Sequence, residues 1–522
     1  MSSVDLSPAN PDSELSDKLD PHLLRLAGVV VLGAFMSILD TTVVNIAIQG
    51  LTKTFQAPLE TTQWISTGYM LALTAIIPLA GWAADRFGTK RLYLTSILLF
   101  LIGSALSGAA WSMSSLIVFR VLQGLGGGMI LPTGMTLLSL AAGPQRMGRL
   151  MGIVGLPIVL GPILGPTLGG WLVDEVSWRW IFFINLPIGA IALYAAYRVL
   201  DTDESKPHHA LDWTGFLLLS PGLGIFIYGL TQITVVGDFN SLTADGCAFV
   251  GLAMIVGFTL HALRREDALI DIRLFGRRTV GPVAIISFLL SASAFGMSLL
   301  FPLYFQLVRG YSAFDTGLLV IVEGLGAVLA MPLSGYLVDK IGAGKVVLFG
   351  IVCAAMSVLF LSMIESTSPL WSIEVMLFIV GFGKGSTMMP ATSAALSTLR
   401  KHEIARATSG LNVIQRAGGA LGTALLAVIL TGGISANSEH SGVTAALQQN
   451  LSLGLQQVFS HAFLCALVLI VLSGFAAMFL LRKTAVDGNG GATSAGSNSE
   501  EPPPGKHLGT HLLERVPGSG KV

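Results

Sequence analysis

The sequence predicts an all-α polytopic membrane protein with fourteen membrane-spanning helices, arranged as two six-helix halves with two further helices between them. Three observations predict this fold class. The composition is very apolar, apolar segments of membrane-spanning length follow one another along almost the whole chain, and short motifs of the first half recur in the second.

The composition excludes a soluble globular protein. Hydrophobic residues make up 52% of the 522-residue chain and charged residues only 11%, against roughly 25% charged residues in a typical soluble domain. Helices are expected because every backbone polar group must be hydrogen-bonded inside the lipid. The 30 basic and 30 acidic residues cancel, so the net charge indicates no nucleic-acid partner. The three cysteines show no metal-site spacing, and we expect no metal and no organic cofactor.

Apolar segments long enough to cross roughly 30 Å of hydrocarbon define the expected spans. They cover approximately residues 26–49, 62–83, 92–110, 114–140, 150–173, 181–198, 213–233, 246–263, 280–307, 317–338, 346–365, 371–396, 408–432 and 459–481. The longest connection, 433–458, has the composition of a segment that could hold a surface helix.

The spans divide the chain into five regions. Residues 1–24 are an acidic polar tail rather than a cleavable signal peptide, because they lack its basic start and short apolar core. The remaining regions are an N-terminal half at 25–198, a linker with two spans at 199–279, a C-terminal half at 280–482, and a Gly-, Ser- and Pro-rich tail at 483–522 that we expect to be disordered.

The basic residues predict the orientation. Cytosolic loops of membrane proteins carry an excess of Lys and Arg. With both termini in the cytosol, the outer loops receive only Lys53, Arg179 and Arg309, and nearly all other basic residues fall on the cytosolic side. One missed or extra span would move the later basic loops to the outer side, so the distribution of basic residues favours fourteen spans with both termini inside.

An internal repeat relates the two halves. The segment from Gly81 to Gly88 recurs from Gly335 to Gly342, with an aspartate followed by a basic residue at the same places. Two further echoes pair Arg149, Gly161 and Gly165 with Arg406, Gly418 and Gly422, and Pro132 with Pro390. Chance recurrence of glycine patterns is the alternative, but the echoes agree in order and spacing. Repeated halves are a transporter layout, with the cargo path between them near the membrane midplane.

Five motifs lie in a fixed order along the first half. They are Leu39-Asp40-Thr-Thr-Val-Val-Asn45, then Gly81-x-x-x-Asp85-Arg86-x-Gly88-x-Lys90-Arg91, Arg120-x-x-Gln123-Gly124-x-Gly126, Gly161-Pro162-x-x-Gly165-Pro166-x-x-Gly169-Gly170, and the segment from Trp178 to Gly189. With these motifs, the chain resembles the major facilitator superfamily over about residues 25–482, and in particular its branch of fourteen-helix drug:proton antiporters.

The resemblance implies the major facilitator fold and a multi-pass protein of the inner (plasma) membrane. It also implies a monomer that exports amphipathic, often cationic, compounds in exchange for protons. An exporter dedicated to one metabolite, antibiotic, lipid or siderophore is the alternative transporter function. A membrane-embedded enzyme or receptor is disfavoured because no catalytic cluster is evident, and the absence of a GxxxxGK[ST] loop disfavours direct ATP drive.

Asp40 and Arg120 are the candidates for proton coupling. A carboxyl group inside the membrane is costly when ionised, so it should face a cavity or a partner, and it can bind and release a proton as its surroundings change. Arg120 keeps its charge but can act on a nearby carboxylate. For both residues a purely structural role is the alternative.

Further polar residues within the spans are candidates for the cargo path. Glu323 could attract a cation, bind a proton or pair with a base, and a pair with Lys384 is one hypothesis. A buried Lys384 would suit an anion or zwitterion better than a dication. Arg416 could pack a helix or act as a latch, and Asn45 and Gln123 are the remaining candidates.

The two repeated loops are expected to form a cytoplasmic gate. Their residues are Gly81, Asp85, Arg86, Gly88, Lys90 and Arg91, and then Gly335, Asp339 and Lys340. Asp85 is expected to contact a helix end or an arginine in one conformation only, with ordinary loop charge as the alternative. The Gly and Pro residues at 161–170 predict a tight contact between spans, because small residues let helices approach closely.

Overall fold

The computed structural model describes residues 20–142, 146–201, 210–236, 242–265, 268–311, 313–364, 368–439 and 446–490. The chain divides into two units, 1–481 and 482–522, and the helix bundle belongs to the first. Every regular element among the described residues is helical.

The first half contains α2 (Pro21–Phe55), α3 (Leu59–Phe87), α4 (Thr89–Gly108), α5 (Met113–Ala142), α6 (Met147–Trp171), the π-helical turn η1 (Leu172–Val176), α7 (Trp180–Phe183) and α8 (Asn185–Val199). The linker holds α9 (Trp213–Val236), α10 (Leu242–Arg264) and the 3₁₀ helix η2 (Ile272–Gly276). The second half contains α11 (Val280–Leu307), α12 (Ala313–Ile341), α13 (Ala343–Ser362), α14 (Leu370–Gly385), α15 (Met388–Leu396), α16 (Lys401–Glu439) and α17 (Ala446–Gly490).

The membrane-crossing segments match the predicted fold class. Thirteen segments of the described chain are long and apolar enough to cross a bilayer, with α7 and α8 forming one segment and α14 and α15 another. Helix α6 adds 25 residues, which at about 1.5 Å per residue measure roughly 37 Å and therefore also span the hydrocarbon. The prediction of an all-α polytopic protein is confirmed.

Two boundaries differ from the sequence-based expectation. The connection expected at 433–458 is largely helical, because α16 continues to Glu439 and α17 begins at Ala446. Helix α17 also continues to Gly490, past the predicted start of the tail at 483. Once a helix has formed, adding further residues costs little, and polar residues can continue it. The end of the apolar segment therefore does not mark the end of the helix. Residues 1–19, 440–445 and 491–522 lie outside the described residues.

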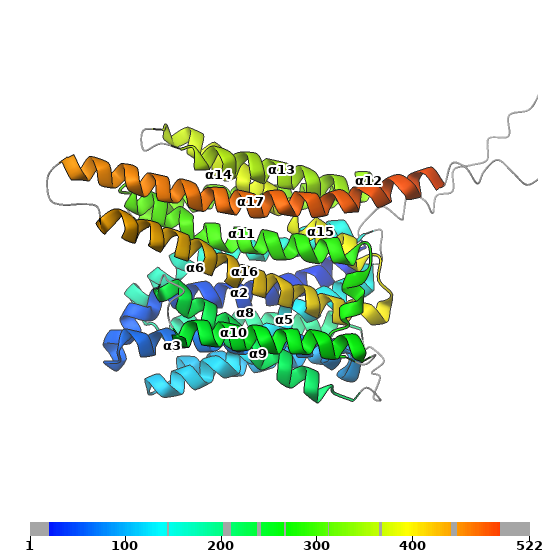
Figure 1. Ribbon diagram of the computed structural model, residues 1–522. Helices are drawn as coiled ribbons and strands as arrows, with labels where there is room; N and C mark the ends of the chain where they lie inside the picture. Colours follow the sequence, from blue (N-terminus) through cyan, green and yellow to red (C-terminus); the bar gives the residue numbers. More distant parts are fainter. Residues whose placement is uncertain are drawn as a thin grey trace, which may run out of the picture. The chain divides into compact units, whose positions relative to one another are not determined.

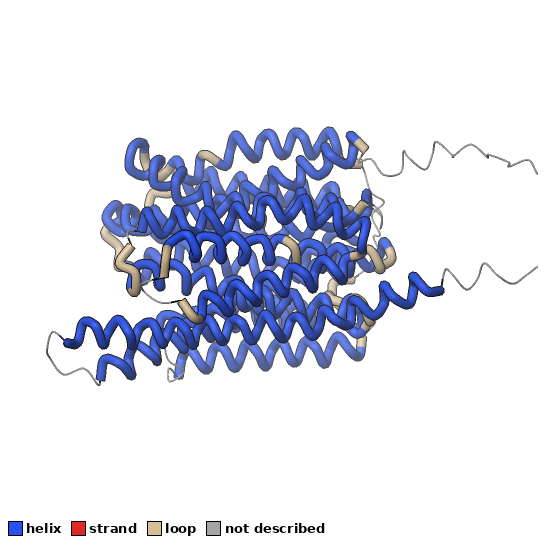
Figure 2. The backbone as a smooth tube through the Cα atoms, turned by 90° about the horizontal axis from the view of Figure 1, so that it is seen from above, coloured by secondary structure: helices blue, strands red, loops and turns tan. Residues whose placement is uncertain are grey.

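The helices of the first unit run side by side along one direction (Figures 1 and 2). In the first half α2 packs on α6 and α5 packs on α3 and α4, while in the second α11 packs on α16 and α14 packs on α12 and α13. The halves meet along two seams, α3 with α16 and α6 with α12. Helix α9 lies against α3 and α16, and α10 packs mainly on α9, so the inserted pair covers the first seam.

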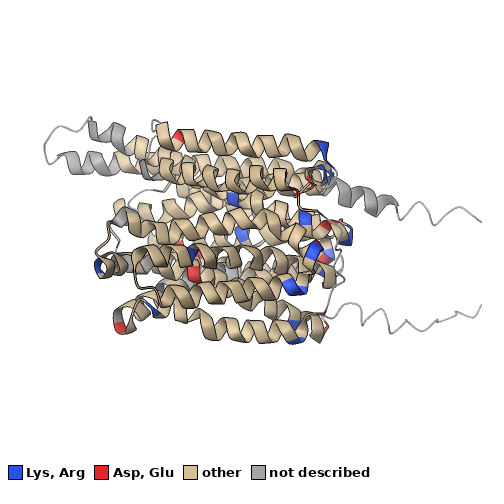
Figure 3. Ribbon diagram, turned by 90° about the horizontal axis from the view of Figure 1, so that it is seen from below, with Lys and Arg blue, Asp and Glu red and all other residues tan. Residues whose placement is uncertain are grey.

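Basic side chains are distributed unevenly over the bundle. Figure 3 shows that Lys and Arg gather mainly at one end of the helices. The positive-inside rule assigns the more basic end of such a bundle to the cytosol. This orientation stays a prediction.

The repeat is visible in the backbone of the two matched loops. Gly88 has φ 86° and ψ 147°, and Gly342, its counterpart, has φ 87° and ψ 147°. This conformation is essentially restricted to glycine. Each glycine ends a helix by donating its N–H to the carbonyl four residues earlier, Ala84 or Val338. The same turn therefore recurs at the same place in both halves.

Asp212 fixes the inserted helix pair at the start of α9. Its buried carboxylate accepts hydrogen bonds from the Gly215 N–H at 3.0 Å and the Leu269 N–H at 3.4 Å, and it contacts His261 Nε2 at 3.0 Å. Burial raises the pKa of this carboxyl group, but these hydrogen bonds outweigh burial, so the pKa lies below its ordinary value. The contacts join both ends of the α9–α10 pair to the segment before η2.

Candidate functional site

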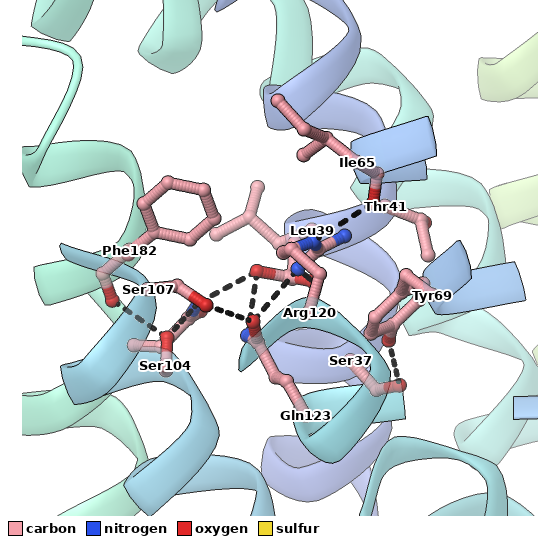
Figure 4. A network of polar contacts seen from close by, with 12 residues as sticks. Ser37, Leu39, Thr41, Ile65, Tyr69, Ser104, Ser107, Arg120, Gln123 and Phe182 are labelled. Carbon is pink, nitrogen blue, oxygen red and sulfur yellow. Dashed lines mark hydrogen bonds and ion pairs between the residues drawn. The ribbon is translucent and has the colours of Figure 1, made fainter. Parts of the chain in front are cut away.

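Asp40 of α2 belongs to a buried polar network with side chains of α5 and α8. Figure 4 shows Arg120 and Gln123 of this network from close by. The Asp40 side chain is 1% exposed. Oδ2 accepts a hydrogen bond from Arg120 Nη1 at 2.6 Å, and Oδ1 accepts from Gln123 Nε2 at 2.9 Å and Asn185 Nδ2 at 3.0 Å. A buried carboxylate is tolerated when it is paired and fully hydrogen-bonded, and these three donors meet that condition. The structure thus brings together Asp40, Arg120 and Gln123.

Arg120 is held from several sides. Its Nη1 also donates to Gln123 Oε1 at 2.8 Å, and its Nε donates to the Ile65 carbonyl at 3.3 Å. The guanidinium carbon lies 4.0 Å from the centroid of the Tyr69 ring, a cation–π distance. These contacts hold the charged group in place for its hydrogen bond to Asp40, and Figure 4 shows Arg120 beside Gln123 and Tyr69.

Asn185 is a network residue that the sequence analysis did not single out. Its Nδ2 donates to both Asp40 Oδ1 and Ser104 Oγ, the latter at 3.1 Å, and Ser104 Oγ donates to the Phe182 carbonyl at 2.9 Å. The side chain is fully buried at the first turn of α8. The sequence signal for Asn185 is its position inside the motif from Trp178 to Gly189.

A cavity of about 360 Å³ lies beside this network. It is lined by Thr41, Ser66, Thr67, Tyr69, Met70, Leu71, Thr74, Arg120, Ile227, Thr231, Phe295, Arg416, Gly419, Ala420 and Thr423. These residues come from both halves and from α9. Arg120 is part of the lining whereas Asp40 is not, so the guanidinium stands between the carboxylate and the cavity.

Glu323 of α12 and Lys384 of α14 form an ion pair through Oε1 and Nζ, as hypothesised. Glycines bring the two helices together, since a Cβ at Gly381 would meet the Glu323 carbonyl oxygen at 1.8 Å. Both side chains are partly buried. Neither residue lines the cavity at the α3–α16 seam, so this pair is separate from the Asp40 network.

Two ion pairs join the halves at the repeated loops. Asp85 Oδ2 lies 3.4 Å from Arg406 Nε, and Asp339 Oδ2 lies 3.0 Å from Arg149 Nε. The aspartates are counterparts in the repeat and so are the arginines, so each pair is the other's symmetry mate. Asp85 therefore contacts an arginine, one of the two kinds of partner that the sequence predicts for it, and this arginine lies near the start of α16 in the other half.

The other predicted gate residues surround these pairs. A Cβ at Gly81 would lie 3.1 Å from the Arg406 Cα, so this glycine permits the close approach of α3 and α16. Lys90 Nζ donates to the Leu200 carbonyl, and Lys340 Nζ lies 4.5 Å from the Tyr336 ring centroid. Gly335 is buried, Arg86 is partly buried, and Arg91 is exposed.

The glycines of α6 produce the predicted tight contact. A Cβ at Gly161 would lie 2.4 Å from Ile38 Cγ2, one at Gly165 would lie 2.0 Å from Thr42 Oγ1, and one at Gly169 would lie 3.1 Å from Val43 Cγ1. These three glycines thus face the part of α2 that carries Asp40. Gly170 points into open space. The side chains of Pro162 and Pro166 lie outside the described residues, as does that of Asn45.

The pseudo-symmetric halves, the cavity between them and the ion pairs that join them at one end define a class of protein: helical membrane transporters with two repeated domains. The profile of the family described as Major Facilitator Superfamily matches residues 30–423. The chain therefore belongs to this family and is a multi-pass inner-membrane transporter rather than an enzyme.

Relatives and solved structures agree with this membership. A multidrug resistance protein B homolog of Mycobacterium tuberculosis is 43% identical over 427 residues, which cover 81% of this chain and 79% of the relative. The multidrug export protein EmrB of Haemophilus influenzae is 32% identical over 405 residues, with coverage of 77% and 79%. The structure of the proton:xylose symporter XylE aligns with TM-score 0.57 and 15% identity over 86% of this chain and 94% of that one, a likeness of fold alone.

Proposed function

We propose that this protein exports amphipathic drugs across the plasma membrane in exchange for protons, by alternating access and as a monomer. The names of its relatives support multidrug efflux as the class of transport. Proton coupling is the further step, and one observation carries it. A buried carboxylate, Asp40, accepts a hydrogen bond from Arg120, and Arg120 also lines the cavity.

The coupling we propose uses competition for Asp40. With Arg120 and Gln123 donating to it, the carboxylate is satisfied as an anion. Protonation would remove its charge and weaken the contact with Arg120, which also lines the cavity. A proton that binds Asp40 would weaken its contact with Arg120, and a cargo molecule that displaces Arg120 would weaken the same contact. Binding of the cargo and binding of the proton would therefore affect each other.

The gate supplies the alternation. Placing both termini in the cytosol puts the pairs Asp85–Arg406 and Asp339–Arg149 at the cytosolic ends of their helices. The cavity residues of α16, from Arg416 to Thr423, lie several turns further along this helix than Arg406. In this orientation the described conformation is closed toward the cytosol, and breaking both pairs would open access from the cytosol.

The charge of the cargo is a separate question. The resemblance implies cationic compounds, and Glu323 is the acidic side chain that could attract one, although Lys384 already pairs with it. No acidic residue is among the described residues that line the cavity. The cavity therefore offers a cation little electrostatic attraction.

The test uses purified protein in liposomes with an internal pH dye and an imposed proton gradient. Three probes are added in turn: ethidium, the neutral N-phenyl-1-naphthylamine and the anionic 8-anilinonaphthalene-1-sulfonate. We expect at least one probe to trigger proton movement with the wild type and with Asp201→Asn, an exposed control, but not with Asp40→Asn. Proton antiport is contradicted if well-inserted wild type responds to no probe, or if Asp40→Asn responds like the wild type.

A further inference from the structure

Helix α9 forms one wall of the cavity. It belongs to the pair inserted between the two halves, yet its residues Ile227 and Thr231 line the cavity together with residues of α3 and α16. The Tyr228 ring stacks on Trp64 of α3, with centroids 5.8 Å apart, and Leu230 and Ile233 pack in an apolar cluster with Ala424 of α16. These contacts close the side of the cavity that would otherwise face lipid at the seam between the halves.

Arg416 gives this cavity a positive charge that no acidic side chain of the described part of the chain pairs with. Its side chain is partly buried within α16 and lines the cavity, and no hydrogen bond or ion pair joins it to any described residue. The Asp40 carboxylate is already paired with Arg120, the other arginine of the lining. Two guanidinium groups thus border the cavity and one carboxylate stands behind them.

The rest of the lining is amphipathic. Hydroxyl groups of Thr41, Ser66 and Thr67 surround the polar part, whereas Met70, Ile227 and Phe295 supply apolar surface. A cavity of about 360 Å³ falls in the range of roughly 300–1,000 Å³ that holds a small organic ligand. The chemistry fits a molecule with an apolar body and one acidic group.

We propose that this cavity binds an amphipathic organic anion, with its carboxylate or sulfonate on Arg416 and its apolar body against α9. The proposal rests on the proposed export function and names the charge of its cargo. A guanidinium donates hydrogen bonds to such oxyanions in a bidentate geometry. The partly buried Arg416 guanidinium, which has no hydrogen-bond or ion-pair partner among the described residues, would also repel a cation of similar shape. Arg416 would thus favour the anion by attraction and disfavour the cation by repulsion.

The first experiment measures equilibrium binding to purified protein in nanodiscs, with a matched pair of fluorescent probes. 8-Anilinonaphthalene-1-sulfonate and N-phenyl-1-naphthylamine share one aromatic body and differ in the sulfonate. Arg416→Gln should raise the Kd of the sulfonate probe by at least about tenfold, the size expected when a charged hydrogen-bond partner is lost. It should change the Kd of the neutral probe less than about twofold, a shift too small for a lost charge contact.

Two controls accompany it. Arg278→Gln removes the same charge from an exposed loop position and should leave both Kd values unchanged. Arg416→Lys keeps the charge and should retain part of the affinity for the sulfonate probe. An equal loss for both probes in Arg416→Gln would mean that the arginine only supports packing, and unchanged binding of both would mean that the anion binds elsewhere; either result overturns the proposal.

The second experiment tests the wall formed by α9. Ile227→Trp places a larger side chain in the cavity and should raise the Kd of both probes by about tenfold or more. With the probe bound, the extra volume overpacks the cavity, which costs on the order of 1–3 kcal/mol. Leu217→Trp changes the same helix at a side chain that is 59% exposed and should raise neither Kd. Equal effects of the two substitutions would refute the placement of the apolar body. Binding needs no proton gradient, so these outcomes are independent of whether Asp40 couples transport to protons.

Discussion

The Asp40 network shows what residue-level reasoning can and cannot supply. A carboxylate and an arginine inside apolar spans are costly, and that cost alone marks Asp40 and Arg120 as candidates. The partners of Asp40, however, lie 80, 83 and 145 residues away along the chain. Only the packing of α2, α5 and α8 decides that these side chains meet, so neither the pairing nor the part of Asn185 follows from the sequence.

Asn185→Leu should weaken the network without removing its charges. The substitution deletes one donor to Asp40 Oδ1 and the hydrogen bond to Ser104, so a buried carboxylate loses a partner. We expect a loss of about 1–3 kcal/mol in the free energy of unfolding. Thermal unfolding in detergent measures it, with Asn412→Leu as a control in which the amide bonds only within its own helix. Equal stability of Asn185→Leu and the wild type would contradict the network.

The pair of Glu323 and Lys384 makes a prediction of its own. Removing one partner leaves the other charge partly buried and unpaired, whereas removing both leaves no such charge. Glu323→Gln and Lys384→Met should therefore each destabilise the protein, and the double variant should lose less than the sum of both. A coupling of about 0.5–3 kcal/mol is expected. Additive losses in the same unfolding assay would show that the two side chains do not depend on each other.

At the scale of elements, composition predicted which segments cross the membrane but not where the helices end. Hydropathy reports the apolar part of a helix, whereas α16 and α17 continue through polar residues to lengths of 39 and 45 residues. The glycines of α6 were more informative. Their spacing of four predicted a close contact, although the sequence left open that the neighbour is the stretch of α2 next to Asp40.

Gly165→Ala and Gly170→Ala form a matched test of that contact. A Cβ at position 165 would lie 2.0 Å from Thr42 Oγ1 and 2.7 Å from Thr42 Cβ, whereas one at position 170 meets nothing within 4 Å. We expect Gly165→Ala to lower the free energy of unfolding by about 1–3 kcal/mol through overpacking. Gly170→Ala should be neutral or slightly stabilising, because alanine favours a helix by about 1 kcal/mol over glycine. Identical melting temperatures of the two variants would refute the predicted contact.

At the scale of the whole molecule, two ion pairs join the halves at one end of the bundle. The repeat predicted two similar loops, but it left open that each aspartate contacts the arginine of the opposite half. That crossing follows from the pseudo-twofold relation between the halves, which exchanges Asp85 with Asp339 and Arg406 with Arg149. Because of this symmetry, the same Asp–Arg ion pair occurs twice, and each copy joins one half to the other.

Asp85→Asn should shift the protein toward the state that is open at this end. A partly buried ion pair of this kind contributes on the order of 1 kcal/mol, which corresponds to a several-fold change in the ratio of closed to open molecules. A cysteine introduced on the cavity side of the Asp85–Arg406 pair should be alkylated several-fold faster in Asp85→Asn than in the wild type. Insertion into the membrane should stay normal, and transport should slow. Exchanging the charges with Asp85→Arg and Arg406→Asp should restore slow alkylation. Failure of this exchange, with intact insertion, would assign Asp85 a structural role at its helix end.

The inserted pair α9–α10 contacts the two halves mainly through α9 and crosses the bilayer twice. An insertion that crosses the membrane twice returns the chain to the side where it started. The second half therefore enters the membrane from the same side as it would without the insertion. A single added helix would invert that half and separate Asp339 from Arg149 by the full thickness of the membrane. Helices can therefore be inserted between the two halves only in even numbers, because an odd number would separate the residues of the two ion pairs.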